Sequence, residues 1–266
     1  MKIIFWNIKK KDLSNELDDL VKAEFPEFLI LCECSIHPSL LLLKFNTPKT
    51  LYSFINTRTP NISVFTSFSD RFVKVEEDGG RHVILRISLP LKQEILLVPL
   101  HLPDKGHWNE LSQKYECISI SSSICDVEQK RGISETIVVG DFNMNPFEEG
   151  MISTLGFHAV RDKNIAFKKR RKVQGQYFKF FFNPMWEFYS TVLTPPGTYY
   201  YYSSEHVCHF WNLFDQFIFR PELITKFNYS DFRILTKFKH HQLTRGNGLI
   251  SESYSDHLPI KASFNI

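Results

Sequence analysis

The sequence contains no long uninterrupted hydrophobic run. Near its start, in MKIIFWNIKKKD, the apolar stretch at residues 3–6 is shorter than the apolar core of a secretory signal or a membrane span. We therefore expect a soluble, unprocessed chain with no transmembrane segment.

Cysteine is scarce, and its spacing suits neither a disulfide framework nor a metal-binding finger. The five cysteines are Cys32, Cys34, Cys117, Cys125 and Cys208. An odd number without paired metal-ligand spacing favours free thiols in a reducing compartment, so we expect a cytoplasmic protein. Cys32 and Cys34 would share one face of a strand, which predicts two buried thiols.

Linkers and repeats are also absent. No Gly/Ser-rich or Pro-rich stretch divides the 266 residues, and 43% of them are hydrophobic, enough for a sizeable core. We therefore expect a single domain covering residues 1–266. Residues 165–208 stand apart because they are first basic and then strongly aromatic, and we expect them to form an insertion or a large surface loop.

The order of apolar patterns predicts an α/β fold. Residues 2–8 and 28–34 are apolar, strand-like runs, and leucines recur at helical spacing between them, at residues 12–25. Many short strand patterns follow, then an amphipathic helix at about 107–128 and further strands, including residues 209–219 and 258–266. Two packed sheets flanked by helices accommodate this order.

Positive charge is concentrated in one segment. The chain carries a formal net charge of only +3, yet residues 161–180 contain eight basic residues and one acid, a local net charge of +7. Such a segment suits a polyanion such as nucleic acid, although a mobile solvated loop would have the same composition. The candidate phosphate-binding residues are Lys168, Lys169, Arg170, Arg171 and Lys172.

Aromatic residues follow this basic segment. Exposed tyrosines at 199–202, with Tyr177, Phe178 and Trp186, would stack on unpaired bases. Burial of the same side chains within strands is the alternative.

Six apolar segments each carry a polar residue at or near one end. One such residue alone is most simply a turn or cap residue. Together they describe a site for a hard cation such as Mg²⁺, which prefers oxygen ligands, with an imidazole available for proton transfer. The six residues are Asn7, Glu33, His101, Asp141, Asp215 and Asp256, the last followed directly by His257.

The stretch VVGDFNMNPF at residues 138–147 places Asp141 and Asn143 directly after an apolar strand. We expect Gly140 to act as the hinge that lets the backbone turn tightly there.

These motifs, in this order, resemble the endonuclease/exonuclease/phosphatase superfamily, which includes deoxyribonuclease I, AP endonucleases, deadenylases, neutral sphingomyelinases and inositol polyphosphate 5-phosphatases. The resemblance extends from Asn7 to Ile260. The matching motifs are WN at 6–7, PEFLILCE at 26–33, PLHL at 99–102, GDFN at 140–143, FDQFIF at 214–219 and SDHLPI at 255–260. It implies a four-layer α/β/β/α sandwich of two mixed sheets.

The resemblance also implies roles for individual residues. Glu33 matches the main metal ligand, assisted by Asn7 and Asp256, for Mg²⁺ with Mn²⁺ as a substitute. Asp141 and Asn143 match residues that hold the attacking water or the phosphate.

His257 and Asp215 match an Asp–His pair that acts in proton transfer, with Asp141 as the rival base, and His101 would stabilise the transition state or protonate the leaving group. Arg81 would contact phosphate. His101 also favours the deoxyribonuclease, deadenylase and phosphatase branches over the AP endonucleases, which carry a tyrosine-type residue there.

The predicted function is therefore Mg²⁺-dependent phosphodiester hydrolysis, with DNA or RNA as the first-choice substrate. A phosphatase or phospholipase acting on an inositol phosphate or a sphingomyelin-like headgroup is the second reading, and a non-catalytic nucleic-acid-binding module is the third. The sequence does not distinguish DNA from RNA, endonuclease from exonuclease action, or one metal ion from two, and it indicates no protein partner.

Overall fold

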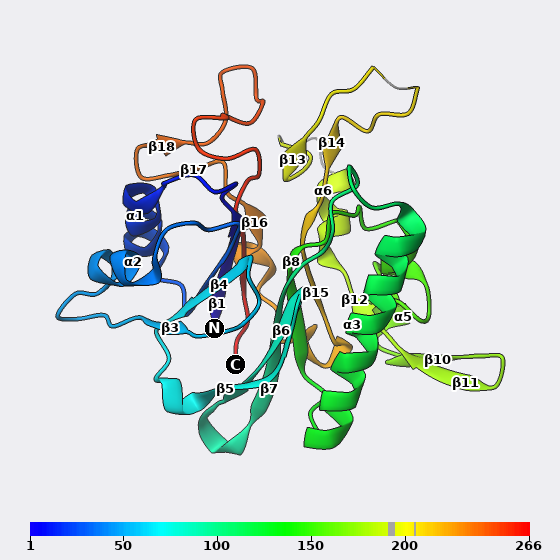
Figure 1. Cartoon of the computed structure of the whole chain (residues 1–266). Helices are drawn as coiled ribbons and strands as arrows, with labels where there is room; N and C mark the ends of the chain where they lie inside the picture. The colour runs from blue at the N-terminus through cyan, green and yellow to red at the C-terminus, as the bar shows by residue number, and fades with distance from the viewer. Residues whose placement is uncertain (191–194, 205) are drawn as a thin grey trace.

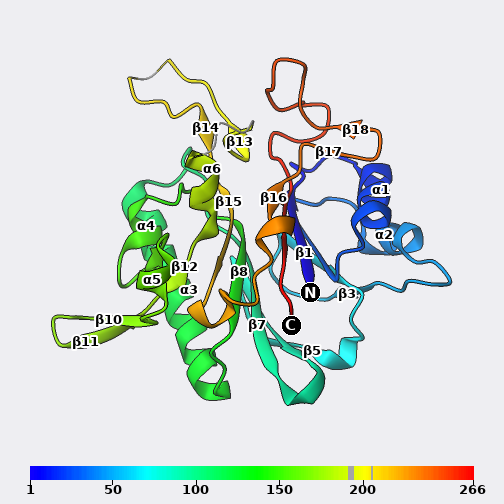
Figure 2. The ribbon, with the colours of Figure 1, turned by 180° about the vertical axis from the view of Figure 1, so that it is seen from behind.

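Two β-sheets pack face to face, and helices cover their outer faces. The computed structural model describes residues 1–190, 195–204 and 206–266. Figures 1 and 2 show α1 and α2 outside one sheet and α3 to α5 outside the other, which confirms the expected four-layer sandwich.

The first sheet has six strands in the order β16-β19-β1-β2-β4-β3. It is mixed, because β1 and β2 are parallel whereas β19 and β4 run antiparallel to them. Its strands are β1 (Lys2–Asn7), β2 (Phe28–Cys32), β3 (Ser53–Ile55), β4 (Ile62–Thr66), β16 (Arg233–Ile234) and β19 (Ile260–Ser263).

The second sheet has seven strands in the order β5-β6-β7-β8-β15-β12-β9. It is also mixed, since β7 and β8 are parallel and β15 is antiparallel to β8. Its strands are β5 (Val73–Gly79), β6 (His82–Ser88), β7 (Glu94–His101), β8 (Thr136–Asp141), β9 (Ala159–Val160), β12 (Phe181–Phe182) and β15 (Asp215–Phe219).

The helices begin and end at recognisable signals. Asn109 caps the long helix α3 by accepting from the Ser112 amide, and Gly132 ends it in the left-handed conformation. None of the described helices is long and apolar enough to cross a membrane. The helices are α1 (Ser14–Glu24), α2 (Pro38–Phe45), α3 (Glu110–Arg131), α4 (Glu149–Ile152), α5 (Lys163–Ala166) and α6 (Glu187–Ser190).

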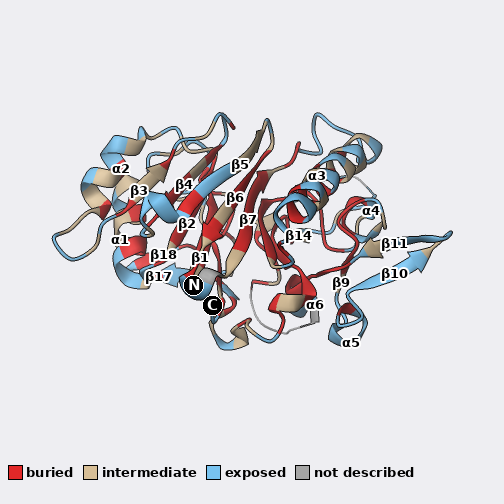
Figure 3. Cartoon of the chain, turned by 90° about the horizontal axis from the view of Figure 1, so that it is seen from below, coloured by how far each residue is buried: buried red, intermediate tan, exposed pale blue. Residues whose placement is uncertain are grey.

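The core lies between the two sheets. Strands β1 and β2 are buried along almost their whole length, which explains their continuous apolar sequences. Figure 3 shows buried residues concentrated in the central strands and exposed ones on the outer helices and on the β10–β11 hairpin.

Three two-stranded hairpins project from this body. They are β10 (Arg170–Val173) with β11 (Gln176–Lys179), β13 (Tyr199–Tyr200) with β14 (Trp211–Asn212), and β17 (Lys237–Phe238) with β18 (His241–Gln242). Part of segment 165–208 is nevertheless internal, because β12 lies between β15 and β9 in the second sheet. Of this segment, residues 191–194 and 205 lie outside the described residues.

Three local expectations were wrong. The strand expected at 209–219 is divided into β14 and β15, and α2 was not expected at all. Strand β2 ends at Cys32, so Cys34 lies beyond it and is only half-buried, whereas Cys32 is fully buried. The two thiols therefore do not form the buried pair predicted from their spacing.

Candidate functional site

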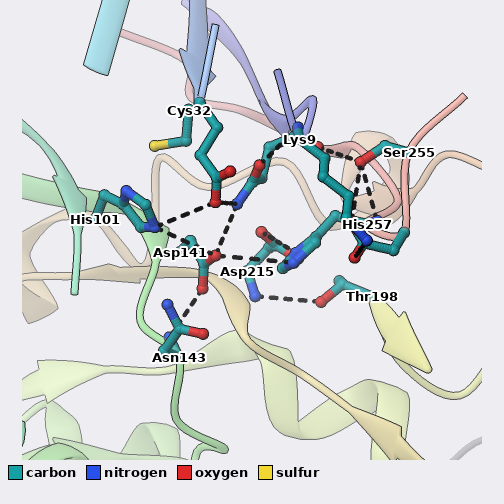
Figure 4. A network of polar contacts seen from close by, with 12 residues as sticks. Lys9, Cys32, His101, Asp141, Asn143, Thr198, Asp215, Ser255 and His257 are labelled. Carbon is teal, nitrogen blue, oxygen red and sulfur yellow. Dashed lines mark hydrogen bonds and ion pairs between the residues drawn. The ribbon is translucent and has the colours of Figure 1, made fainter. Parts of the chain in front are cut away.

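The polar strand ends meet at one end of the sandwich. In the second sheet, Asp141 lies opposite both His101 of β7 and Asp215 of β15 in the strand register. The end of β1 and the residue after β2 bring Asn7 and Glu33 of the first sheet to the same place. Figure 4 shows His101, Asp141, Asp215 and His257 gathered there. Residues spread over most of the chain therefore lie side by side.

Asn7 joins the two sheets. Its Nδ2 donates to Glu33 Oε1 at 3.2 Å and to Asp141 Oδ2 at 3.0 Å. Glu33 follows β2 with a φ of 50°, a left-handed backbone that turns its side chain towards the site. One amide thus fixes the two carboxylates relative to each other.

Gly140 has a different role from the one predicted. It lies inside β8, not at a turn, and a Cβ added there would lie 2.0 Å from the carbonyl oxygen of Leu100. The turn is made instead by Asn143, whose φ is 48°. Glycine is needed because β7 and β8 approach closely, and this close approach places Asp141 beside His101.

Asp141 is the most connected carboxylate of the site. It is buried, and its Oδ1 accepts from the backbone amide of Asn143 at 2.9 Å. Its Oδ2 lies 3.9 Å from Nε2 of both His101 and His257. The side-chain amide of Asn143 donates to the Leu102 carbonyl at 2.8 Å, which holds this loop against β7.

His257 is held by Asp215. Its Nδ1 lies 2.8 Å from Asp215 Oδ2, and both residues are buried. Burial opposes the charged imidazolium, but Asp215 and Asp141 outweigh it and raise the pKa of His257. With Nδ1 bound to Asp215, Nε2 is the ring nitrogen that faces the site.

Two supporting residues, Thr198 and Ser255, were not singled out from the sequence. Thr198 Oγ1 accepts from the Asp215 amide at 3.2 Å. The ring of Tyr199, one of the tyrosines expected to stack on bases, lies 4.7 Å from that of His257. Ser255 Oγ donates to the Asn7 carbonyl at 2.7 Å and accepts from the His257 amide at 3.2 Å. Ser255 belongs to the SDH motif and could have been singled out there, whereas no local signal marks Thr198.

The donor set of the site fits a divalent cation. In the described part of the chain, no lysine or arginine forms an ion pair with Glu33, Asp141 or Asp215. Within the described residues, histidines are the only ion-pair partners of these three converging carboxylates, and such a concentration of negative charge favours a bound cation. Asp141, Asp215 and His257 also offer ligand atoms within 4.8 Å of one another.

Asp256 has a partner of its own. Its Oδ2 lies 2.6 Å from Lys9 Nζ, and the same contact raises the pKa of Lys9. The structure therefore places Asp256 at the rim of the site, engaged with an ammonium group.

Arg81 lies near the site through its backbone. Its carbonyl accepts from the His101 amide at 2.9 Å, while its guanidinium lies over the Trp108 ring at 5.0 Å.

The basic segment is not brought together with the site. Figures 1 and 2 show the β10–β11 hairpin projecting sideways beyond α5, away from the end of the sandwich where β13 and β17 lie. Its cations have local partners: Lys169 pairs with Glu222 at 3.1 Å, and Arg171 Nε donates to His158 Nε2 at 2.9 Å.

Comparison with known proteins shows the same architecture at low sequence identity. No family model matches the chain, and no curated protein matches it. The 3' phosphatase NExo from Neisseria bound to a product DNA hairpin has a TM-score of 0.60 at 13% identity, and an AP endonuclease from Archaeoglobus fulgidus has 0.59 at 16%. Both alignments cover 100% of each chain.

An endonuclease/exonuclease/phosphatase family protein from Bacteroides thetaiotaomicron has a TM-score of 0.57 at 12% identity, over 98% of this chain and 96% of that one. These likenesses extend over the whole chain, as the motif resemblance did. The chain therefore has the fold of the endonuclease/exonuclease/phosphatase superfamily.

Proposed function

We propose that this chain is a metal-dependent phosphodiester hydrolase that acts on nucleic acid. The observation that carries the proposal is the convergence of Glu33 and Asp141, without a lysine or arginine partner among the described residues, beside the Asp215–His257 pair. Hydrolysis of a phosphodiester requires neutralisation of the phosphate, an aligned water and proton transfer, and this set of groups supplies all three.

Glu33, assisted by Asn7, would hold Mg²⁺ or Mn²⁺. The bound ion supplies charge neutralisation for the phosphate. Asp256 could bind the metal only if its carboxylate also contacted the ion or gave up its ion pair with Lys9. We therefore assign Asp256 a secondary role as a metal ligand. Asn143 and Asp141 border the position of the phosphate and the water.

Nε2 of His257 is the atom to which we assign the proton transfer with water. A cation held beside Asp141 would offset the carboxylate charges that raise the pKa of His257, and the ring could then accept the proton. Both oxygens of Asp141 already accept hydrogen bonds, Oδ2 from Asn7 and Oδ1 from the Asn143 amide. Among the described residues, Nε2 of His257 has only the long contact to Asp141, while Asp215 fixes the ring. His101, 3.8 Å from Glu33, is placed to stabilise developing charge or protonate the leaving oxygen.

An aromatic stack beside His257 supports nucleic acid over a small headgroup. The Tyr199 ring contacts His257 and stacks on Phe214 at 5.2 Å, and Lys105 Nζ lies 5.8 Å from the Phe214 ring. Rings next to an ammonium group suit a base and its adjoining phosphate. The exposed rings of Tyr201 and Tyr202 continue this surface along the hairpin.

The decisive experiment is a substrate panel with purified protein. Supercoiled plasmid, end-labelled single-stranded DNA and RNA, and inositol polyphosphates are incubated with Mg²⁺ or with EDTA. We expect Mg²⁺-dependent cleavage of a nucleic acid, lowered about 10³-fold or more in His257→Gln and unchanged in His37→Gln, an exposed histidine whose ring contacts Ser39 of α2.

The His257→Gln variant is purified in the same way as wild type, so any cleavage that remains in its preparation gives the level of contaminating nuclease. If only inositol phosphates are cleaved, the protein is a phosphatase rather than a nuclease. Equal cleavage by wild type and His257→Gln would remove the proposal, and EDTA-insensitive binding without hydrolysis would favour a non-catalytic module. A larger loss in Asp141→Asn than in His257→Gln would make Asp141 the base.

A further inference from the structure

A second group of metal-binding side chains lies on the first sheet's side of the molecule. Asp19 is on α1, and His240 and His241 are at the turn of the β17–β18 hairpin, which packs against that helix. One donor atom from each of the three residues lies within 4.8 Å of the other two. None of the three belongs to the site proposed for hydrolysis.

The geometry brings both imidazoles to one carboxylate oxygen. Nε2 of His241 lies 2.9 Å from Asp19 Oδ2, and Nε2 of His240 lies 3.9 Å from the same atom. Zinc bound tetrahedrally at about 2.1 Å from each ligand separates its ligands by about 3.4 Å, which falls between these two distances. The longer distance belongs to His240, the exposed ring, so His240 is the ligand that must approach on binding.

The other oxygen of Asp19 has a separate partner. Lys239 Nζ lies 2.7 Å from Asp19 Oδ1, so the ammonium group and the imidazoles use different lone pairs. The hydrogen bonds from Lys239 and His241 lower the pKa of Asp19 to about 2. The nearby ammonium charge at the same time weakens cation binding.

The hairpin that carries the histidines is anchored to the core. The Phe238 ring packs edge-on against Trp6 at 6.2 Å, and His241 is buried beside Phe238 and Tyr254. His240, in contrast, is exposed. The site therefore has one rigid imidazole, one accessible imidazole and an open side for water.

We propose that Asp19, His240 and His241 form a binding site for a zinc-class divalent cation, chemically distinct from the oxygen-rich site at Glu33. Two imidazoles and one carboxylate suit Zn²⁺, Co²⁺ or Ni²⁺ rather than Mg²⁺, which prefers oxygen ligands. A bound ion would join α1 to the hairpin across more than 200 residues of sequence.

The test uses Co²⁺ as the probe, with Mg²⁺ in large excess to occupy the oxygen-rich site. Visible absorption reports Co²⁺ bound by imidazole, and competition with Zn²⁺ gives the zinc affinity. We expect His240→Gln to weaken Zn²⁺ binding more than about tenfold, since it removes one ligand. His107→Gln is the matched control, because His107 is equally exposed and also contacts a carboxylate, that of Asp104.

Two further variants separate this site from others. Lys239→Gln should tighten Zn²⁺ binding, since it removes a competing positive charge, and Glu33→Gln should leave the Co²⁺ spectrum unchanged. Equal Zn²⁺ affinity in wild type and His240→Gln, or loss of the Co²⁺ spectrum in Glu33→Gln, would overturn the proposal. Neither readout requires hydrolysis, so failure here and failure of the proposed activity are distinguishable.

Discussion

Gly140 shows how one missing side chain determines the geometry of the site. Its hydrogen lies where a Cβ would meet the Leu100 carbonyl, a backbone atom that cannot rotate away. Gly140→Ala must therefore push β7 and β8 apart, and we expect it to lower the free energy of unfolding by about 1–3 kcal/mol. Urea denaturation measures the change.

Gly80→Ala provides the control for this prediction, since a Cβ there would meet nothing within 4 Å. We expect its unfolding midpoint to match wild type. Equal stability of Gly140→Ala and wild type would show that the β7–β8 approach is not as tight as the structure indicates.

His158 gives a pH dependence remote from the site. Its Nδ1 donates to the Lys179 carbonyl and its Nε2 accepts from Arg171, an arrangement that requires the neutral ring. Burial, opposed by the hydrogen bond to Lys179, lowers its pKa to about 4. The unfolded chain then binds one more proton between pH 4 and about 6.5, so stability must fall as pH falls through this range.

We expect His158 to account for about 2 kcal/mol of that loss. His158→Gln should therefore have a flatter profile of unfolding free energy against pH over the same window. Parallel profiles for the two proteins would contradict the assignment.

At the scale of elements, we predict that the basic residues at the β10–β11 hairpin attract nucleic acid without taking part in catalysis. Lys168, Arg170 and Lys172 are exposed, and the hairpin itself projects away from the end of the sandwich where β13 and β17 lie (Figure 1). Replacing these three by Gln should flatten the salt dependence of nucleic-acid binding by up to three charges, and leave turnover of a small phosphodiester unchanged. Titrations over a salt series measure the slope.

The matched control replaces Lys49, Lys74 and Lys130, which are also exposed, by Gln. It changes the net charge equally but on other faces of the molecule. The same change of slope in both triple variants would mean that only net charge matters, and that the hairpin is not a specific contact surface.

The sequence predicted the helices and strands whose apolar residues recur at a regular spacing. It missed those whose formation depends on contacts with distant parts of the chain. Helix α1 and strands β1 and β2 are apolar at the spacing their structures demand, so their prediction was confirmed. Helix α2 is short, with leucines at four consecutive positions, and therefore has no helical period to detect. The break between β14 and β15 places Asp215 at the start of a strand and cannot be seen in a continuous apolar run.

The candidate site was predictable for a different reason. Its residues stand at strand ends within motifs, so their types and order carry the signal even though no single one does. The residues that pair with them come from other segments of the chain. Lys9 forms its ion pair with Asp256, and Thr198 its hydrogen bond with the Asp215 amide, only in the folded protein. Long-range contacts of this kind have no signature in a single sequence.

At the scale of the whole molecule, the carboxylate cluster lies where the two sheets meet. The negative charges of Glu33, from the first sheet, and Asp141, from the second, repel each other there. Mg²⁺ should therefore raise the melting temperature, with about 2.7 kcal/mol of stabilisation at a hundred times its dissociation constant. In EDTA, Glu33→Gln should be more stable than wild type because one of the repelling charges is gone, and Mg²⁺ should stabilise it less. Calorimetry with EDTA and with Mg²⁺ measures both effects.

If Mg²⁺ raises the melting temperature of Glu33→Gln as much as that of wild type, the ion does not bind at Glu33. The exposed His37→Gln variant serves again as the control. Because His37 caps α2 by accepting from the Ser39 amide, the melting temperature of this variant shifts equally in both buffers, and we expect its gain from Mg²⁺ to equal that of wild type.

The position of β19 has a consequence for how the chain becomes active. This strand lies inside the first sheet, between β16 and β1, and His257 stands three residues before its first residue, Ile260. During synthesis, β1 must therefore wait for β19, which is made much later, before this neighbour is in place. Under the proposed function, His257 arrives in the same step, so the nascent polypeptide could not hydrolyse a phosphodiester until this part of the chain has been made and inserted.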